Sequence, residues 1–268
     1  MDINALKNKK IFLFDMDGTI YNDDHLFDQV PEMLAFLKGI GKKYFFLTNN
    51  SSKSTSDYVK KLRRLGIVAQ REDIIISTHI AASYLIRQYD QRPIYVVGTD
   101  SMVKELQDRG VNAVTKLIDG IVAVLVGNDN ELTFQKLRNA SLLLTQGIDF
   151  IATNVDKACP VSFGYVPDCG AICEMLTHAT GKKPLYMGKP HAEIVNYIKA
   201  KTGVISRDVV MIGDRLYTDM AMAIKRGMTS VLVLSGEATN DTLGKFPHKV
   251  DYVFDDIAAM YRAMKGSV

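Results

Sequence analysis

Short apolar runs alternate with segments of helical periodicity along almost the whole chain. The first run, residues 11–14, is apolar throughout and flanked by polar residues, and after it Val30, Met33 and Leu37 recur at helical spacing. Such runs are typical of strands that are buried on both faces of a parallel sheet. The alternation therefore predicts an α/β protein.

Further apolar runs predict more strands, each short and followed by turn residues. They lie at residues 44–47, from residue 74, and at residues 94–97, 120–126, 150–152, 185–187 and 209–212. Helical spacing predicts helices at residues 55–65 and 80–89, around Met102 to Leu106, around Phe134 to Leu144 behind a capping Thr133, and after Pro190. The middle of the chain thus forms a second αβ series. Because 268 residues exceed a typical domain of about 100 to 150, one enlarged domain or two domains are expected.

The composition excludes several classes of protein. Hydrophobic residues make up 47% and charged residues 24% of the chain, which excludes disordered and fibrous classes. The 33 basic and 30 acidic residues are interspersed and leave a net charge of only +3, so neither nucleic acid nor an anionic membrane is an expected partner. The longest aliphatic run, residues 121–126, is too short to cross a bilayer, and residues 1–10 lack the apolar core of a signal peptide.

The cysteines indicate a reducing compartment. Cys159, Cys169 and Cys173 are odd in number and contain no Cys-x-x-Cys pair, which argues against a disulfide framework. A cytoplasmic protein is therefore expected. Cys169, Cys173 and His178 could share one side of a helix and hold zinc, although small buried cysteines are the commoner outcome.

Two aspartates follow the first apolar run, where it meets a glycine. Asp15 and Asp17 precede Gly18, so both carboxylates are expected beside the carboxyl end of the first strand, where open α/β sheets bind their ligands. Two like charges this close repel unless a cation or a shared proton is present, and Mg²⁺ is the simplest partner. By themselves the three residues slightly favour a plain strand-to-turn junction.

Three other strand ends carry similar polar residues. Five short hydrogen-bonding side chains, residues 48–52, follow the second run and suit either a helix cap or phosphate binding. Lys189 lies between a strand end and a helix start, where it could face an anion, although a surface position is commoner for a lysine. Asp214 and Asp219 follow the run at residues 209–212 and suit an acidic site, a turn or a helix cap.

The combination favours chemistry over independent turns. Four residues each follow an apolar run: Asp15, Thr48, Lys189 and Asp214. One parallel sheet would gather all four at the same edge. They supply a carboxylate nucleophile, a hydroxyl donor, a fixed cation and oxygen ligands for a hard metal, and Asp17 adds a carboxyl for proton transfer. These are the groups that phosphoryl transfer requires.

The sequence around these residues forms four motifs: Asp15-Met16-Asp17-Gly18-Thr19, Thr48, Lys189, and Gly213-Asp214 with Asp219. In these motifs the chain resembles the haloacid dehalogenase (HAD) superfamily. Further segments resemble its NagD-like, para-nitrophenylphosphatase-like subgroup: residues 47–51, 152–154, 169–171 and 187–190. The resemblance implies a Rossmann-like three-layer core with a parallel sheet, formed by residues 1–78 and 185–268, and an inserted αβ cap domain at residues 79–184.

The resemblance also implies a role for each motif residue. Asp15 is the nucleophile that attacks phosphorus and becomes an aspartyl phosphate, while Asp17 protonates the leaving oxygen and later activates water. Mg²⁺ would be held by a carboxylate oxygen of Asp15, the backbone carbonyl of Asp17 and the carboxylate of Asp214. Asp219 would support these ligands or orient Lys189.

Contacts to phosphate and substrate are expected from the remaining motifs and from the cap. The resemblance assigns Thr48 and Lys189 to the phosphoryl group, whose charge they offset, and Asn49 and Asn50 as further donors to phosphate or substrate. Asp168 stands where relatives often have glycine. It would contact a leaving group that bears hydroxyls or an amine, or it would be a solvated loop acid.

Substrate selection is expected in a long loop of the cap, residues 154–170. A cap over the site implies small phosphomonoesters, such as nucleoside monophosphates or sugar phosphates. The expected function is a Mg²⁺-dependent phosphatase, with two alternatives: a catalytically weak regulatory protein that binds a phosphorylated metabolite, and a phosphomutase. No Gly-x-Gly-x-x-Gly follows a strand, which sets aside a nucleotide-cofactor oxidoreductase. The oligomeric state, including a homo-oligomer, is left open.

Overall fold

The structure, a computed structural model, describes residues 2–161 and 163–266. The chain divides into two compact units. The first consists of Met1–Thr48, Val59–Ile75 and Val195–Val268, and the second of Asn49–Tyr58 and Ile76–Ile194. Among the helices described, none has the length and apolar character that a membrane span requires.

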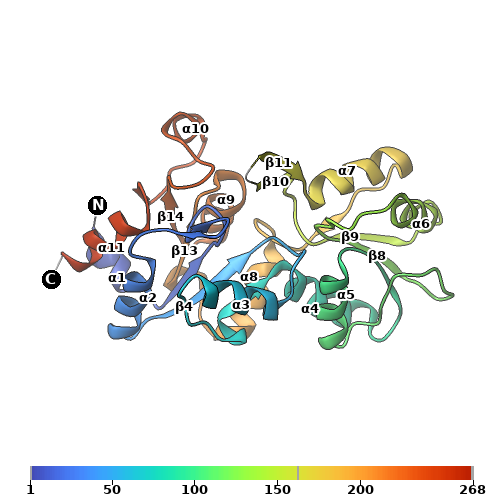
Figure 1. Cartoon of the computed structure of the whole chain (residues 1–268), viewed down its shortest axis with the longest axis horizontal. Helices are drawn as coiled ribbons and strands as arrows, with labels where there is room; N and C mark the ends of the chain where they lie inside the picture. The colour runs from blue at the N-terminus through green and yellow to red at the C-terminus, as the bar shows by residue number, and fades with distance from the viewer. Residues whose placement is uncertain (1, 162, 267–268) are drawn as a thin grey trace. The chain divides into compact units, whose positions relative to one another are not determined.

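The first unit is built on a six-stranded sheet in the order β15-β14-β13-β1-β4-β5. Figure 1 labels β4, β13 and β14 of this sheet. Its strands are β1 (Ile11–Phe14), β4 (Lys43–Thr48), β5 (Ile74–Ile76), β13 (Val209–Gly213), β14 (Thr229–Val233) and β15 (Tyr252–Phe254). β1 pairs in parallel with β13 on one side and β4 on the other, so that Phe14 lies opposite Ile212 and Phe46. Every residue of β1 and β13 is buried, as expected for strands covered on both faces.

Helices pack around this sheet. They are α1 (Ile3–Lys7), α2 (Val30–Gly39), α9 (Ala221–Arg226), α10 (Asn240–Lys245) and α11 (Ile257–Lys265). The unit also contains two short 3-10 turns, η1 (Arg71–Asp73) and η2 (Ser206–Asp208), and an antiparallel hairpin of β2 (Tyr21–Asn22) and β3 (His25–Leu26). α2 contacts α11, where the rings of Phe36 and Tyr261 meet edge to face with centroids 5.9 Å apart. Two further helices, α3 (Thr55–Arg64) and α8 (Ala192–Thr202), have residues in both units.

The second unit has its own parallel sheet, in the order β12-β9-β8-β6-β7. Its strands are β6 (Ile94–Val97), β7 (Ala113–Val114), β8 (Ala123–Val126), β9 (Asp149–Ala152) and β12 (Leu185–Tyr186). Its helices are α4 (Ser77–Tyr89), α5 (Asp100–Asp108), α6 (Phe134–Thr145) and α7 (Cys169–Thr180). A buried apolar cluster that includes Tyr95, Val124 and Ile172 joins the sheet to α6 and α7.

The predicted α/β fold is confirmed, and so are most individual elements. α6 begins behind Thr133, whose hydroxyl accepts the Lys136 N–H as the predicted cap. α4 begins at Ser77, before the predicted start at residue 80. The prediction missed the first turn because its residues are polar, although they are buried. The predicted domain boundaries, at residues 79 and 184, stay a prediction.

Two predictions about strands are wrong. The run at residues 185–187 was expected to join the sheet that carries Asp15, but it forms β12, which pairs with β9 in the second unit. Residues 154–170 were expected to form a loop, but they contain an antiparallel hairpin of β10 (Ala158–Val161) and β11 (Gly164–Pro167). The two prolines in this hairpin concealed it, and they are tolerated because both strands of a two-stranded ribbon are edge strands.

Candidate active site

The sheet of the first unit changes direction between β1 and β13. From β1 the chain moves outward to β4 and β5, and it later returns to β13 on the other side of β1. Ligands of open α/β sheets bind at the carboxyl ends of strands beside such a switch point. Asp15 directly follows β1, Asp214 directly follows β13, and the Asp15 N–H donates to the Ile212 carbonyl at 2.8 Å. The structure therefore brings these two predicted residues together.

Three buried carboxylates meet at this switch point. Asp15, Asp214 and Asp219 each offer one oxygen, and these oxygens lie within 4.8 Å of one another. Burial, together with the charges of Asp15 and Asp219, raises the pKa of Asp214 to about 8. Buried acids this close are unfavourable as anions unless a cation joins them. Because all three donors are carboxylate oxygens, the cluster fits a hard divalent metal ion.

Close contacts on several sides hold Asp214. Its Oδ1 accepts the Thr19 hydroxyl at 3.2 Å, and its Oδ2 accepts the Glu237 N–H at 2.8 Å. Gly18 and Gly236 lie so near the carboxylate that a Cβ atom on either residue would overlap it. Only glycine allows the backbone to approach this closely. The position of the carboxylate is thus set by two loops as well as by β13.

Asp219 lies in a π-helical turn, η3 (Leu216–Met220), that follows β13. Its Oδ2 accepts the Arg215 N–H at 3.1 Å, and its side chain lies against Gly213, where a Cβ atom would not fit. Asp219 was expected to support the metal ligands or orient Lys189. Its place among the three carboxylates is compatible with the first of these roles.

Asp17 has different surroundings from the three buried acids. Its side chain is 36% exposed, and Lys61 Nζ lies 3.6 Å from its Oδ1. The Tyr21 hydroxyl lies 3.4 Å from its Oδ2. Lys61 is itself buried, and its ammonium lies 3.7 Å from the centroid of the Tyr21 ring. Asp17 therefore combines access to solvent with a fixed cation beside it, which suits a group that exchanges protons.

The polar segment that follows β4 belongs to the second unit from Asn49 onward. Ser51 Oγ lies 3.0 Å from Thr153 Oγ1, and Asn50 Oδ1 accepts both the N–H and the hydroxyl of Ser52. The sequence left helix capping and phosphate binding open for this segment. The structure shows a third use, because these hydrogen bonds fix the segment within the second unit.

Lys189 also belongs to the second unit. It follows β12 and is only 2% exposed, so it is not the surface lysine that the sequence allowed. Its N–H donates to Asn49 Oδ1 at 2.9 Å. The prediction that one sheet gathers Lys189 with Asp15 is wrong, because the strand before Lys189 pairs with β9.

Asp168 and its neighbouring cysteines have structural contacts. Asp168 is buried and caps α7, since its carboxylate accepts the Cys169 N–H. It is therefore not a solvated loop acid. Cys169 and Cys173 are buried with their Sγ atoms 4.0 Å apart, and burial raises the pKa of the Cys173 thiol. Within residues 2–161 and 163–266, three metal-ligating side chains meet only in the aspartate cluster, so the zinc alternative finds no support.

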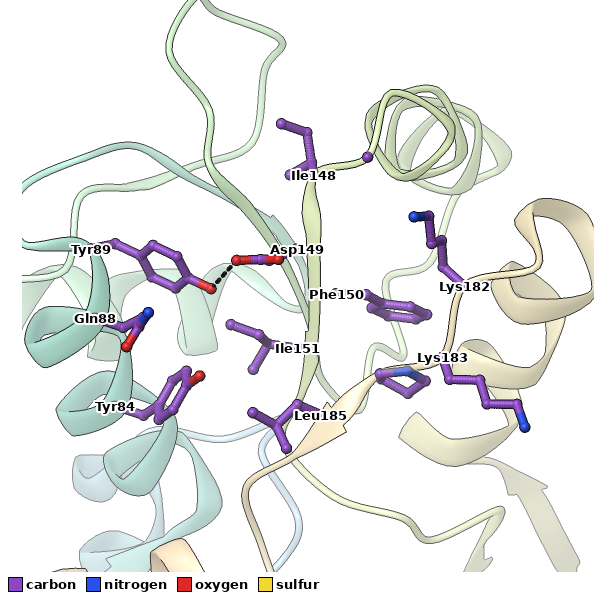
Figure 2. Close-up of a pocket in the computed structure, with 12 residues that line it drawn as sticks. Tyr84, Gln88, Tyr89, Ile148, Asp149, Phe150, Ile151, Lys182, Lys183 and Leu185 are labelled. Atoms are coloured by element: carbon purple, nitrogen blue, oxygen red, sulfur yellow. Dashed lines mark hydrogen bonds between the residues drawn. The ribbon is translucent and has the colours of Figure 1, made fainter.

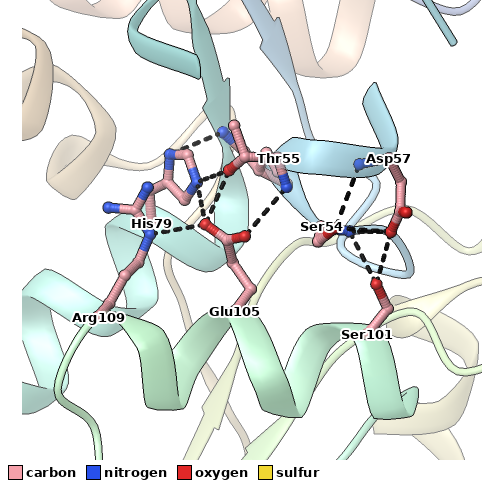
Figure 3. A network of polar contacts seen from close by, with 8 residues as sticks. Ser54, Thr55, Asp57, His79, Ser101, Glu105 and Arg109 are labelled. Atoms are coloured by element: carbon pink, nitrogen blue, oxygen red, sulfur yellow. Dashed lines mark hydrogen bonds and ion pairs between the residues drawn. The ribbon is translucent and has the colours of Figure 1, made fainter. Parts of the chain in front are cut away.

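A buried polar network fastens the start of α3 to α5 (Figure 3). The Glu105 carboxylate accepts the Thr55 hydroxyl at 2.7 Å and lies 3.0 Å from both His79 Nε2 and Arg109 Nε. Burial alone would raise the pKa of Glu105, but hydrogen bonds from His79 and Thr55 outweigh it and hold the pKa well below its usual value. Ser101 and Glu105 lie along one face of α5, and Arg109 follows on the same side as the residue that caps its carboxyl end.

A hollow of about 400 Å³ lies beside β9 in the second unit (Figure 2). Tyr84 and Tyr89 of α4 face Asp149 and Ile151 across it. The Tyr89 hydroxyl donates to Asp149 Oδ2 at 2.7 Å, and burial together with this hydrogen bond raises the pKa of Tyr89. None of the site residues predicted from the sequence lines this hollow.

Three contributors to the site were not predicted. Lys61 gave no signal, because a lysine on a charged helix is normally solvated. Thr19 was part of the first motif but had no assigned role. The loop at residues 235–237, which contacts Asp214, did carry a signal, because its Ser235-Gly236 follows an apolar strand as the other motifs do.

Comparison with known proteins assigns the family. Residues 12–112 match the model of the haloacid dehalogenase-like hydrolases, and residues 186–260 match the HAD-hydrolase-like model. The chain is also 30% identical over 250 residues to the 5'-nucleotidase YutF of Bacillus subtilis, which covers 92% of this chain and 96% of that protein. This chain belongs to the haloacid dehalogenase-like hydrolases. The resemblance found in its motifs is thereby confirmed.

Other relatives of this hydrolase are phosphatases. It is 29% identical over 260 residues to the acid sugar phosphatase of Staphylococcus saprophyticus, covering 97% of this chain and 100% of that protein. The solved structure of 4-nitrophenylphosphatase from Thermotoga maritima has a TM-score of 0.91 at 36% identity and covers 97% of this chain and 99% of that one. NagD from Escherichia coli has a TM-score of 0.85 at 27% identity, with 94% and 98% covered. The hydrolase is thus a phosphatase of the NagD-like, para-nitrophenylphosphatase-like subgroup, with a second, inserted sheet.

Proposed function

We propose that this hydrolase is a Mg²⁺-dependent phosphatase that hydrolyses small phosphomonoesters through an aspartyl phosphate on Asp15. The observation that carries the proposal is the buried cluster of Asp15, Asp214 and Asp219 at the switch point of the sheet. The relatives named as sugar phosphatase, 5'-nucleotidase and 4-nitrophenylphosphatase support sugar phosphates or nucleoside monophosphates as the substrate class.

The donors of the cluster suit Mg²⁺. The ion would be held by carboxylate oxygens of Asp15 and Asp214 and by the backbone carbonyl of Asp17. Asp219 would support these ligands. Hard oxygen ligands favour Mg²⁺ over metals that prefer sulfur or nitrogen. When bound, the ion offsets the negative charge of the phosphoryl group.

The two carboxylates of the first motif divide the chemistry between them. An Asp15 oxygen attacks phosphorus, and the bond from phosphorus to the ester oxygen breaks as the new bond forms. Asp17 gives its proton to the leaving oxygen, so the alcohol departs neutral. Asp17 then takes a proton from water, whose oxygen attacks phosphorus and releases phosphate and the free Asp15 carboxylate.

Other predicted residues act on the phosphoryl group and the substrate. The Thr48 hydroxyl and the Lys189 ammonium would offset the charge that develops on the phosphoryl oxygens. Substrate contacts by Asn50 and Asp168 stay predictions, although each side chain already has a contact within its own segment. A homo-oligomer also stays a prediction, which the mass of the protein in solution would test.

Phosphate release from para-nitrophenyl phosphate tests the proposal. Activity is expected with Mg²⁺, to be lost with EDTA, and to fall by at least about 10³-fold in Asp15→Asn, which removes the nucleophile. Asp119→Asn, an exposed aspartate outside the site, is the matched control and is expected to stay active. Activity that survives both EDTA and Asp15→Asn would overturn the proposal.

Two further measurements separate the alternatives. A regulatory protein would bind phosphorylated metabolites tightly without turning any of them over. A phosphomutase would transfer the phosphoryl group to another hydroxyl, so that oxygen from isotope-labelled water would not enter phosphate. Screening phosphate release over sugar phosphates and nucleoside monophosphates would then identify the preferred substrate.

A further inference from the structure

The side-chain amide of Asn49 pairs with the backbone of Lys189. Asn49 Oδ1 accepts the Lys189 N–H at 2.9 Å, and Asn49 Nδ2 donates to the Lys189 carbonyl at 3.2 Å. One side chain therefore holds both polar backbone groups of Lys189. Both residues are buried and belong to the second unit, so neither hydrogen bond competes with bulk water.

Asp156 completes the hydrogen bonds of this amide. Asn49 Nδ2 donates to Asp156 Oδ2 at 2.7 Å, a charge-assisted hydrogen bond. An amide nitrogen has two hydrogens, and both are used, one by Asp156 and one by the Lys189 carbonyl. A carboxylate accepts hydrogen bonds and cannot donate them, so Asp156 must face the Asn49 nitrogen and not its oxygen. Asp156 thereby fixes the orientation of the Asn49 side-chain amide. Asn49 therefore has no amide hydrogen left for a phosphate oxygen.

The surrounding backbone is shaped around this amide. A Cβ atom on Gly188 would lie 2.5 Å from Asn49 Oδ1 and 2.6 Å from the Thr153 carbonyl oxygen, so only glycine lets the amide reach the Lys189 backbone. The Gly188 N–H donates to the same Thr153 carbonyl at 2.7 Å. The loop before Lys189 is thus packed directly against Asn49.

Asn49 and Asp156 are anchored themselves. The Asn49 carbonyl accepts the Ser77 hydroxyl at 2.6 Å and Asn154 Nδ2 at 2.8 Å. The Asp156 carbonyl accepts the N–H of Gly170, in the first turn of α7, at 2.7 Å. A chain of hydrogen bonds therefore runs from α7 through Asp156 and Asn49 to the backbone of Lys189.

We infer that Asn49 and Asp156 are positioning residues for Lys189 and that Asn49 does not bind the substrate. They fix the backbone from which the Lys189 ammonium projects, and Asp156 keeps the Asn49 amide in the orientation that this pairing needs. The inference rests on the proposed function, in which Lys189 acts on the phosphoryl group. It replaces the expectation that Asn49 donates to phosphate or substrate.

A double-mutant cycle tests this inference. Lys189→Ala is expected to lower kcat/KM by about 10²-fold, as the loss of one charge-stabilising donor does. Asn49→Ala and Asp156→Asn are each expected to lower it by about 10-fold, because the ammonium is misplaced. In the Lys189→Ala background, adding Asn49→Ala is expected to cause no further loss of kcat/KM, since the ammonium that this backbone pairing places is already gone. Effects that multiply in the double variant would overturn the inference.

A second measurement reports on the backbone without using activity. The Lys189 amide hydrogen is expected to exchange with solvent faster in Asp156→Asn than in the wild type, because the Asn49 amide is then free to turn over. Unchanged exchange would contradict the role of Asp156. Asn112→Ala, which removes a side-chain amide that bonds to the Gln91 carbonyl, is the matched control and is expected to change neither exchange at Lys189 nor activity.

The outcomes also separate this inference from the proposed function. If the wild-type protein releases no phosphate, or if Lys189→Ala is as active as the wild type, the proposed function or its use of Lys189 fails, and the inference fails with it. If Lys189→Ala is impaired and Asn49→Ala multiplies that loss, the proposed function stands and only the inference fails.

Discussion

The Lys61 ammonium lies 3.6 Å from the Asp17 carboxylate and 3.7 Å from the centroid of the Tyr21 ring. We expect Lys61→Met, which keeps the length of the side chain, to lower kcat by about 10-fold with a smaller effect on KM, because a general acid–base group that is less well placed transfers protons more slowly. Steady-state kinetics with para-nitrophenyl phosphate measure this. Lys60→Met, on an exposed neighbour in α3, is the control, and equal kinetics for both variants would refute the role of Lys61.

The raised pKa of Asp214 predicts a link between pH, stability and metal binding. In the metal-free protein this carboxyl keeps its proton up to about pH 8, whereas an unfolded chain releases it near its ordinary pKa of about 3.9. The native state therefore binds more protons across this window, and its free energy of unfolding falls as the pH rises. Mg²⁺ needs the carboxylate, so its affinity should rise with pH by up to about tenfold per unit until about pH 8.

Thermal unfolding with EDTA and in Mg²⁺ titrations between about pH 6 and 8 measures both effects. Asp214→Asn carries no titrating group at this position, so its metal-free stability should depend less on pH and should respond little to Mg²⁺. A Mg²⁺ affinity that is constant over this pH range would contradict the prediction.

The carboxylate cluster could be predicted because its sequence signal is local. Asp15 and Asp214 each stand directly after an apolar strand, and pairing of adjacent parallel strands brings their carboxyl ends together whatever the intervening loops do. The family motifs added the roles of these residues. Each strand end could thus be recognised from its local residues, although the pairing of β1 with β13 itself joins segments far apart in the chain.

Lys189 and Lys61 could not be placed in this way. β12 supplies two residues of strand, and whether they extend the sheet of β9 or that of β1 depends on packing between segments far apart in the chain. Lys61 is buried with its ammonium against the Tyr21 ring, and helical periodicity in α3 does not show which lysine meets that ring. The Asn49 amide raises the same difficulty, because its partners are distant in sequence.

Glu105 should contribute stability that depends on its charge. Its pKa is held below the usual value, so its hydrogen bonds stabilise the native state fully above about pH 4.3, and that contribution is lost as the pH falls further. Glu105→Gln leaves Arg109 and His79 without a carboxylate partner and should lower the free energy of unfolding by about 2 to 4 kcal/mol near pH 7. Urea unfolding followed by circular dichroism would show this, and the difference from the wild type should shrink on acidification. Glu131→Gln, outside this network, is the control.

Gly236 should be essential for the position of Asp214. A Cβ atom at residue 236 would overlap Asp214 Oδ2, and it would also lie 2.7 Å from the Asp214 Cβ. Gly236→Ala must therefore displace the carboxylate, and we expect it to lower kcat/KM by about 10²-fold and to weaken Mg²⁺ binding, because catalysis is sensitive to displacements of about 1 Å. Gly244→Ala in α10 is the matched control: its Cβ meets no atom within 4 Å, and it should leave activity unchanged while raising stability by about 0.5–1 kcal/mol. Full activity and unaltered Mg²⁺ affinity in a folded Gly236→Ala protein would show that the loop at residues 235–237 does not hold Asp214 in place.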